Sequence, residues 1–344
     1  MGSPRVTVLM TTYNGAALIG ESIASIIAQT YSDFELLVVD DASTDETRAV
    51  VEGFADPRIR LLLLPENRGI VAARNIGFAE TRGRYVAALD HDDLSDPGRL
   101  AIQVAHLDAH PEIVLVASEV RFLSEGQLRP SMRPPGGDAL ATRWQLLTGN
   151  HLSWSSVMFR TDAVRRLGVF MRSEFELADD FDFYHRLLRI GDIVRLDRVL
   201  TTYRYHETNA SRLRRAAMVQ AAARVLSEAY VPWLGAEAAE AAELLAQMPT
   251  EDAAKLSRVG DLLEALLKCF CDSHASAAAD RARIARLAGE SWWRCVRGTM
   301  RSGRPGALLA YRRAASLSGA FSPPLGEELK SFLVGMARMV IPRV

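Results

Sequence analysis

A cluster of three aspartates is the first place in this sequence where residue types and spacing suggest chemistry. Asp90, Asp92 and Asp93 follow directly after the apolar run 85–89. We expect this run to be a buried strand, so that the carboxylates gather where ligands bind in open α/β sheets. Crowded carboxylates repel one another unless a cation neutralises them, and their oxygen atoms suit magnesium or manganese. The alternative is an acidic turn into the next helix, with Asp96 as its N-cap.

Two further groups of aspartates occur at comparable positions. Asp41 comes just after the apolar run 34–39, and Asp179 and Asp180 begin a segment with helical periodicity. An aspartate in the first turn of a helix commonly acts only as a cap, so helix capping is the alternative role for Asp179 and Asp180.

The elements that must position these residues alternate between strands and helices. Polar residues follow each of four strand-like runs, at 6–10, 34–39, 59–64 and 85–89. We therefore expect an α/β fold with a doubly wound, mostly parallel sheet flanked by helices and joined by right-handed connections. Further strands are expected at 113–118, 157–159 and 194–200, and a covering loop at 128–138.

Composition restricts the class of protein. The 344 residues carry a formal net charge of -1, which gives no nucleic-acid signature. Three cysteines give no disulfide framework and suggest a reducing compartment. A strand that begins at Val6 leaves no room for a signal peptide, and no apolar run reaches the roughly 20 residues that span a bilayer. We expect a cytoplasmic protein.

Six motifs in order resemble the inverting glycosyltransferases of family 2, which have the GT-A fold. They are Val-Thr-Val-Leu-Met-Thr-Thr-Tyr-Asn-Gly, Leu-Leu-Val-Val-Asp-Asp-Ala-Ser-Thr-Asp-Glu-Thr, Asn-Arg-Gly with Ala-Arg-Asn, Leu-Asp-His-Asp-Asp, Asp-Asp-Phe-Asp-Phe-Tyr-His-Arg-Leu and Tyr-Arg-Tyr-His. The resemblance covers residues 5–210. It implies a GT-A nucleotide-sugar-binding and catalytic domain over 1–210. The rest of the chain shows no comparable match, and its helical periodicity predicts a helical C-terminal region over 211–344.

The resemblance also implies roles in binding a nucleotide-sugar donor. In the family, the first loop and the Asp-Asp pair hold the nucleotide, so Thr11 and Tyr13 are expected beside the base. Asp41 is the expected acceptor for the uracil N3 proton, which favours a UDP-sugar. The residues expected to contact the ribose or diphosphate are Arg68, Arg74 and Asn75. The alternative for Arg74 is that it lies on the exposed surface of a helix.

The catalytic and metal-binding residues follow from the same resemblance. The family's Asp-x-Asp motif maps onto Asp90 and Asp92, with Asp92 as the direct ligand of manganese or magnesium and Asp90 facing the ribose or a metal-bound water. Asp180 matches the family's base, while Asp179 replaces the usual Glu and leaves open which carboxylate accepts the proton. His206 matches a histidine near the diphosphate or metal; a lone histidine would otherwise be structural.

The function implied is a metal-dependent inverting transferase of the hexosyl type. It would move a sugar to a hydroxyl of a glycan or lipid-linked acceptor, as in cell-surface polysaccharide synthesis. A nucleotidyltransferase would usually show a Gly-rich basic phosphate loop where this chain has Thr11-Thr12-Tyr13-Asn14. The alternative from another class is a catalytically silent nucleotide-sugar-binding or scaffolding protein, which would have no need for a positioned base.

The region after residue 210 is alanine-rich with helical periodicity, and its last part is basic. We expect a helical bundle that packs on the catalytic domain or a second subunit of a homo-oligomer. The alternative is a peripheral contact with the inner face of the membrane, since Trp292 and Trp293 stand beside the basic run.

Overall fold

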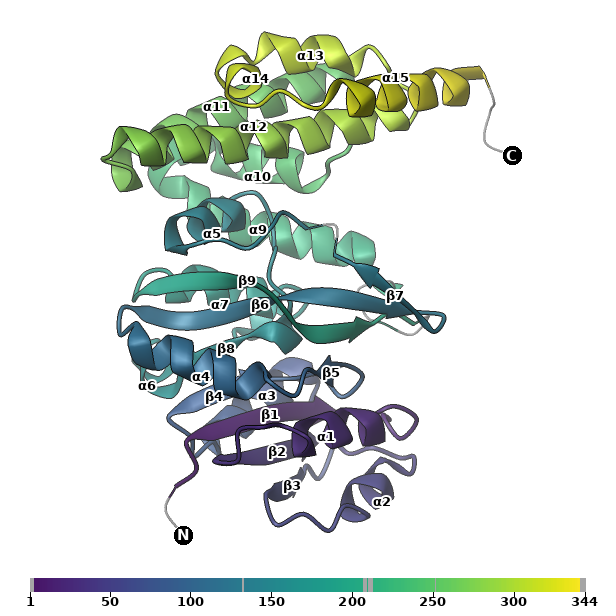
Figure 1. Ribbon diagram of the computed structural model, residues 1–344, viewed down its shortest axis with the longest axis vertical. Coiled ribbons are helices and arrows are strands. Elements are labelled where there is room, and N and C mark those ends of the chain that lie inside the picture. The colour runs from purple at the N-terminus through teal and green to yellow at the C-terminus, as the bar shows by residue number, and fades with distance from the viewer. Residues whose placement is uncertain (1–2, 132, 207–208, 210–212, 251, 341–344) are drawn as a thin grey trace. The chain divides into compact units, whose positions relative to one another are not determined.

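The computed structural model describes residues 3–131, 133–206, 209, 213–250 and 252–340. The chain divides into two compact units (Figure 1). The first comprises Met1–Arg143 and Asn150–Ala221, and the second comprises Trp144–Gly149 and Ala222–Val344.

A nine-stranded sheet forms the centre of the first unit, counted over the described residues. Its order is β3-β2-β1-β4-β8-β6-β9-β5, with β7 paired to β6. The strands are β1 (Val6–Thr12), β2 (Phe34–Asp40), β3 (Ile59–Leu63), β4 (Tyr85–Ala88), β5 (Leu94–Ser95), β6 (Ile113–Ser124), β7 (Gln127–Pro130), β8 (Met158–Arg160) and β9 (Asp192–Arg204).

Strand direction changes halfway across the sheet. Strands β1 to β4 pair in parallel, whereas β8 runs antiparallel to both β4 and β6. The long strands β6 and β9 are again parallel. The expected α/β fold with a sheet flanked by helices is confirmed; its uninterrupted parallel part is β1 to β4, and the remainder is mixed.

Helices connect the strands of the first unit. They are α1 (Ile19–Ile27), α2 (Thr47–Glu52), α3 (Ile70–Ala79), α4 (Arg99–Ala109), α6 (Thr161–Arg166) and α7 (Asp179–Leu187), with short 3-10 turns η1 (Trp154–Ser156) and η2 (Ser173–Phe175). Two more, α5 (Ala139–Leu146) and α9 (Arg215–Leu234), contain the boundaries between the units.

Both faces of β1 and β2 are buried, which explains why their sequences are mostly apolar. Val8 belongs to a core cluster with Ile23 of α1 and Leu100 of α4. On the opposite face, Leu9 lies so close to Gly77 of α3 that an added Cβ would approach its Cδ1 to 2.6 Å. Burial on both faces fixes the strand register and aligns the carboxyl ends of the parallel strands at one edge.

Two local expectations differ from the structure. Helix α4 begins at Arg99 with Gly98 as its N-cap residue, and Asp96 instead accepts a 3.0 Å hydrogen bond from the Gly98 N–H. The segment 128–138 is not wholly a loop, because its first residues belong to β7, which pairs with β6. The turn between these strands uses Glu125 and Gly126 at positive φ.

The second unit is helical. Its elements are η3 (Gly235–Glu237), α10 (Ala238–Ala246), α11 (Ala253–His274), α12 (Ala278–Arg301), α13 (Ala307–Arg313), α14 (Ala315–Ala320) and α15 (Leu325–Val340). Trp292 and Trp293 are buried in it, and the Trp292 indole donates to the Tyr311 carbonyl at 3.3 Å. These tryptophans are therefore core residues and do not form the surface aromatic group that the membrane alternative had assumed. Among the described residues, none of the helices combines the length and apolarity needed to span a bilayer.

Candidate active site

Two loops at the carboxyl ends of β1 and β2 are tied together by Asn14. Its side-chain oxygen accepts the Thr44 N–H at 2.8 Å, and its own N–H donates to Ser43 Oγ at 2.9 Å. Thr11 lies buried at the end of β1, while Tyr13, two residues on, is 47% exposed. The exposed ring of Tyr13 is thus available to stack on a flat partner such as a nucleotide base.

Asp41 connects the end of β2 to the loop before α3. Its two carboxylate oxygens accept the backbone N–H groups of Arg68 and Gly69 at 2.8 and 2.9 Å. The carboxylate is buried, yet each oxygen has a second lone pair with which it can accept a further proton donor. Arg68 meets Asp41 through its backbone, and its guanidinium is more than half exposed.

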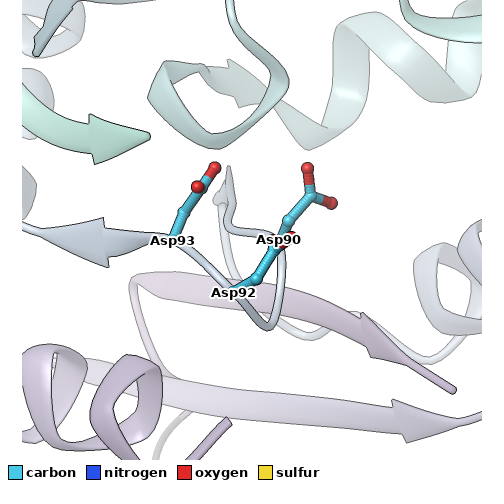
Figure 2. A group of neighbouring side chains, drawn as sticks. All are labelled: Asp90, Asp92 and Asp93. Carbon is cyan, nitrogen blue, oxygen red and sulfur yellow. The ribbon is translucent and has the colours of Figure 1, made fainter. Parts of the chain in front are cut away.

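The aspartates after β4 form a group with the spacing of a metal site. Asp90, Asp92 and Asp93 each offer a carboxylate oxygen, and these oxygens lie within 4.8 Å of one another. Figure 2 shows the three side chains on the single turn between β4 and β5. Three carboxylates form a hard donor set, so these residues fit magnesium or manganese.

The segment after β9 packs onto this turn. His206 Nε2 lies 2.9 Å from Asp92 Oδ2, and the Asn209 amide reaches the same oxygen at 3.4 Å. Arg204 donates its backbone N–H to Asp93 Oδ1 and its Nε–H to the Asp92 carbonyl, both at 2.9 Å. The structure thus brings His206 to the candidate metal ligand, as the sequence had suggested.

Electrostatics of the cluster favour a bound cation. Burial raises the pKa of Asp93 well above its usual range, and the charges of Asp92 and Asp90 add to the effect. Burial also raises the pKa of Asp90, although the guanidinium of Arg74 opposes the shift. A cation among these oxygens would stabilise their ionised forms.

Arg74 joins the cluster to a second acidic site. Its guanidinium donates to Asp179 Oδ2 at 2.6 Å and to Asp90 Oδ1 at 3.2 Å, and it lies over the Trp154 ring at 4.4 Å. Burial alone would lower the pKa of Arg74, but the charges of Asp179 and Asp90 reverse that effect and raise it. Arg74 is therefore a buried cation, and the surface position considered for it is wrong.

The adjacent residues Asp179 and Asp180 at the start of α7 have different partners. Asp179 is buried and paired with Arg74. Asp180 is partly exposed and is held by uncharged donors: the Asn150 amide at 3.0 Å on Oδ2 and the Phe181 N–H at 2.7 Å on Oδ1. Burial, together with the nearby charge of Asp179, raises the pKa of Asp180 to about 6.

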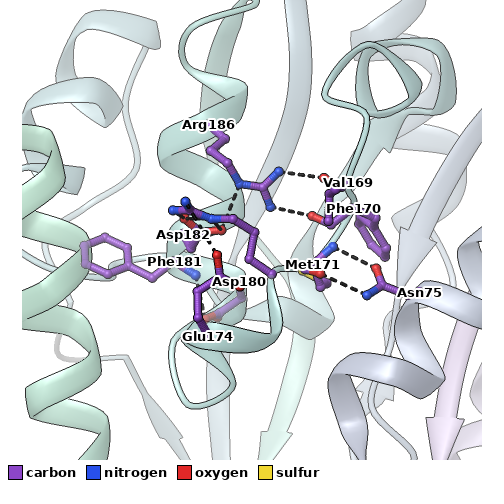
Figure 3. Close-up of polar contacts among 10 residues, drawn as sticks. Asn75, Val169, Phe170, Met171, Glu174, Asp180, Phe181, Asp182 and Arg186 are labelled. Atoms are coloured by element: carbon purple, nitrogen blue, oxygen red, sulfur yellow. Dashed lines mark hydrogen bonds and ion pairs between the residues drawn. The ribbon is translucent and has the colours of Figure 1, made fainter.

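The rest of α7 is anchored to the preceding loop (Figure 3). Asp182 is buried and pairs with Arg172 and with Arg186, and Arg186 also donates to the carbonyls of Val169 and Phe170. These contacts fix the helix whose first turn carries Asp180.

Asn75 contributes to the same anchoring. Its amide accepts the Met171 N–H at 2.8 Å and donates to the Met171 carbonyl at 2.9 Å (Figure 3). A contact between Asn75 and a nucleotide sugar would have to compete with these two bonds. The structure therefore gives Asn75 a positioning role that the sequence motif alone had not indicated.

Three residues of the site were missed from the sequence: Asn150, which holds Asp180; Ser155, whose Oγ accepts the Asp90 N–H at 3.0 Å; and Asn209, beside Asp92. The signal for Asn209 was its place three residues after His206. Asn150 and Ser155 carry no local signal, because only the fold brings them to their partners.

Sequence comparison identifies a family for the first part of the chain. The model of the family described as Glycosyl transferase family 2 matches residues 7–168. The putative glycosyltransferase EpsE of Bacillus subtilis is 32% identical over 197 residues, which cover 55% of this chain and 68% of EpsE.

A second relative is known by a more specific name. The UDP-Glc:alpha-D-GlcNAc-diphosphoundecaprenol beta-1,3-glucosyltransferase WfgD of Escherichia coli is 41% identical over 100 residues, or 29% of this chain and 40% of WfgD. Across five curated relatives, the matched segments span between 24% and 68% of the relative's own length.

Among solved structures, the chain is similar to S. aureus TarS 1-349 in complex with UDP-GlcNAc. The TM-score is 0.56 at 17% identity, and the superposition covers 98% of this chain and 92% of TarS 1-349. At this identity the likeness establishes the fold.

Proposed function

Because the chain belongs to glycosyltransferase family 2, we propose that it transfers a sugar from a UDP-sugar to a hydroxyl group, with inversion and with the help of a divalent metal. The observation that carries the proposal is that the side chain of Arg74 contacts two acidic groups. Arg74 contacts both Asp90 of the acidic cluster and Asp179, the neighbour of Asp180. One guanidinium thus holds a candidate metal ligand and the neighbour of the proposed base in one site, and a sugar transfer needs its leaving phosphate and attacking hydroxyl to be held close together.

A uridine nucleotide fits the donor end of the site. Tyr13 offers an exposed ring for stacking, and the carboxylate of Asp41 suits the N3 proton of uracil. Support for UDP also comes from the UDP-Glc donor in WfgD's name and from the UDP-GlcNAc complex of TarS. Thr11 and the side chain of Arg68 complete the proposed set, with Arg68 directed at the diphosphate.

The metal would be held by Asp92 and Asp90, with His206 beside Asp92. A bound manganese or magnesium ion supplies a Lewis acid that neutralises charge on the departing diphosphate. Arg74 offsets part of the negative charge of Asp90 and Asp179, both of which it contacts.

Asp180 is the base in this proposal. As the acceptor oxygen forms its bond to the anomeric carbon, the bond from that carbon to the phosphate oxygen breaks, and UDP leaves with its electron pair. The acceptor proton passes to Asp180, whose pKa of about 6 lies close to physiological pH. Asp179 is a poorer candidate because its carboxylate already accepts a hydrogen bond from Arg74 in a buried ion pair.

Donor hydrolysis tests the proposed activity. A panel of UDP-sugars, incubated with the chain and manganese, should release UDP slowly from one or a few members, while the matching GDP-sugars and ADP-sugars remain intact. Chelation by EDTA should stop the release. Tight UDP binding with no turnover of any donor, even with glycan and lipid-linked acceptors added, would instead favour a silent binding protein.

Metal binding is tested separately by calorimetry. Asp92→Ala removes the proposed direct ligand, so UDP affinity in the presence of manganese should fall by about tenfold to a hundredfold. Asp162→Ala, an exposed aspartate on α6, is the control and should bind as the wild type does. Equal affinity for wild type and Asp92→Ala would remove Asp92 from the metal site.

A further inference from the structure

Helix α15 of the second unit turns its apolar side outward. Five large apolar residues of this helix are exposed, and spacings of three and four residues place them on one face. They are Leu325, Leu329, Phe332, Leu333 and Met336, and we call them the α15 apolar face. Leu325 is 85% exposed, Leu329 59% and Leu333 57%.

Small and polar residues occupy the opposite, inward side of α15. Ser331 is buried and accepts a 3.1 Å hydrogen bond from Arg301 of α12. Gly335 lies so close to α12 that an added Cβ would meet the Met300 carbonyl oxygen at 2.3 Å. The helix therefore packs through its small residues, which is the reverse of what an amphipathic helix does when its apolar side completes a core.

The chain segment that contains α15 carries a net positive charge. Residues 285–344 contain ten Arg and Lys residues but only three acidic residues, Glu290, Glu327 and Glu328. Each of these glutamates pairs with an arginine: Glu290 with Arg286, Glu327 with Arg297, and Glu328 with Arg312. The remaining charge of this segment is cationic, and Lys330 carries part of it at an exposed position on α15 itself.

Helix α13 extends the combination of apolar and basic side chains. Arg312 contacts Glu328 at 3.1 Å and so lies next to α15. On the same helix, Leu309 is 67% exposed, and Arg313 is exposed as well. Exposed leucines beside exposed cations are the arrangement of a helix that lies in the headgroup region of an anionic bilayer.

We propose that the α15 apolar face, with the exposed cations Lys330 on α15 and Arg313 on α13, docks the protein on an anionic lipid bilayer. Helix α15 would lie in the plane of the interface, with its apolar face toward the acyl chains. A second copy of the chain is a poorer occupant, because pairing two such faces would bring two strongly cationic segments together. The surface lies outside the transfer site, so its test is independent of the proposed activity.

Flotation of the full chain with vesicles tests the proposal. With vesicles of phosphatidylcholine and phosphatidylglycerol at about 0.1 M salt, the wild type should float with the lipid. With vesicles of pure phosphatidylcholine it should remain in the bottom fraction, and salt at about 1 M should weaken its binding to the anionic vesicles.

The double variant Leu329→Gln with Leu333→Gln removes part of the apolar face. Both side chains are exposed, so the fold should be kept, which circular dichroism checks. Binding to anionic vesicles should weaken by about tenfold or more. The matched control is Leu128→Gln, an equally exposed leucine on β7 of the first unit, which should bind as the wild type does.

Three results would overturn the proposal. The first is a wild type that stays unbound with anionic vesicles, and the second is a double variant that floats as well as the wild type. The third is a wild type that light scattering shows to be a dimer and that the double variant converts to a monomer, because the face would then belong to a second copy.

Discussion

Asp179 and Asp180 are neighbours in sequence, yet their surroundings assign them different tasks. A guanidinium neutralises Asp179, whereas two uncharged donors orient Asp180. The same carboxylate chemistry therefore yields a partner in a buried ion pair at one position and a group that can exchange a proton at the next. The sequence alone left this choice open, because both residues match the start of a helix.

The raised pKa of Asp180 leads to a prediction for pH dependence. A base must be deprotonated to act, so kcat/KM for transfer should rise about tenfold per pH unit below 6 and level off above it. The charged groups that face Asp180 are Asp179, Arg74 and Arg133, with Tyr184 as a further titratable neighbour. Arg74 and Tyr184 should stay protonated between pH 5 and 8, because the pKa values of both are raised.

The measurement is a pH profile at saturating manganese. A profile that stays flat down to pH 5 would show that the proton acceptor has an ordinary aspartate pKa and would exclude Asp180 in the environment described here.

Arg74 should matter for stability as well as for activity. Arg74→Met leaves Asp179 buried without its cation, which costs about 3–5 kcal/mol in the free energy of unfolding. Arg68→Met is the matched control: its guanidinium is exposed and lies 3.9 Å from Glu66, so the change should stay within about 0.5 kcal/mol. Chemical denaturation of both variants measures the difference, and equal losses would contradict the buried pair.

At the scale of elements, helix α3 positions Arg74 by packing closely on the sheet. An added Cβ at Gly77 would meet Leu9 Cδ1 at 2.6 Å and Val39 Cγ2 at 2.8 Å, so the helix lies close only because this residue is glycine. The single glycine thus connects strand packing to the position of the guanidinium one turn earlier.

Gly77→Ala should therefore lower the free energy of unfolding by about 1–3 kcal/mol and slow transfer, because α3 must move away from β1 and β2. Gly20→Ala in α1 is the control, since its Cβ would meet Val50 Cγ1 at an ordinary 3.5 Å. Thermal unfolding compares the two. A Gly77→Ala variant as stable as Gly20→Ala would show that a Cβ fits between α3 and the sheet and would contradict the close packing.

The sequence predicted the elements that carry their own signal. Strands β1, β2 and β4 are mostly apolar and buried on both faces, and the parallel alignment brings the polar residues at or just after their ends to one edge. The antiparallel insertion of β8 between β4 and β6 was not predictable, because the short segment Met158–Arg160 carries no information on direction. Asn150 was missed for a related reason: it meets Asp180 across 30 residues of chain.

The second unit shows the limit of helical periodicity. The pattern predicted helices correctly but not which side of each faces inward. Trp292 and Trp293, which looked suited to a surface, are buried, while the leucines of α15 are exposed. Ser331 and Gly335 determine this orientation because they allow close contact with α12. Small residues contribute little to a hydrophobic pattern, so the sequence did not indicate which side of α15 packs inward.

At the scale of the whole molecule, the first unit gathers residues that are widely separated in the chain. Asp41, Asp92, Asp180 and His206 all belong to it; Asp180 lies on α7 and His206 in the segment after β9. Donor binding should depend on the loops after β1, β2 and β4, and proton removal on the start of α7. The two tasks should therefore be separable by mutation.

Asp180→Asn tests this account most directly. The amide keeps the shape of the side chain but cannot accept the proton, so transfer should fall by about a hundredfold to ten-thousandfold while calorimetry shows unchanged UDP binding with manganese. Asp162→Asn on the exposed surface of α6 should leave both unchanged. Transfer at the wild-type rate by Asp180→Asn would contradict the account.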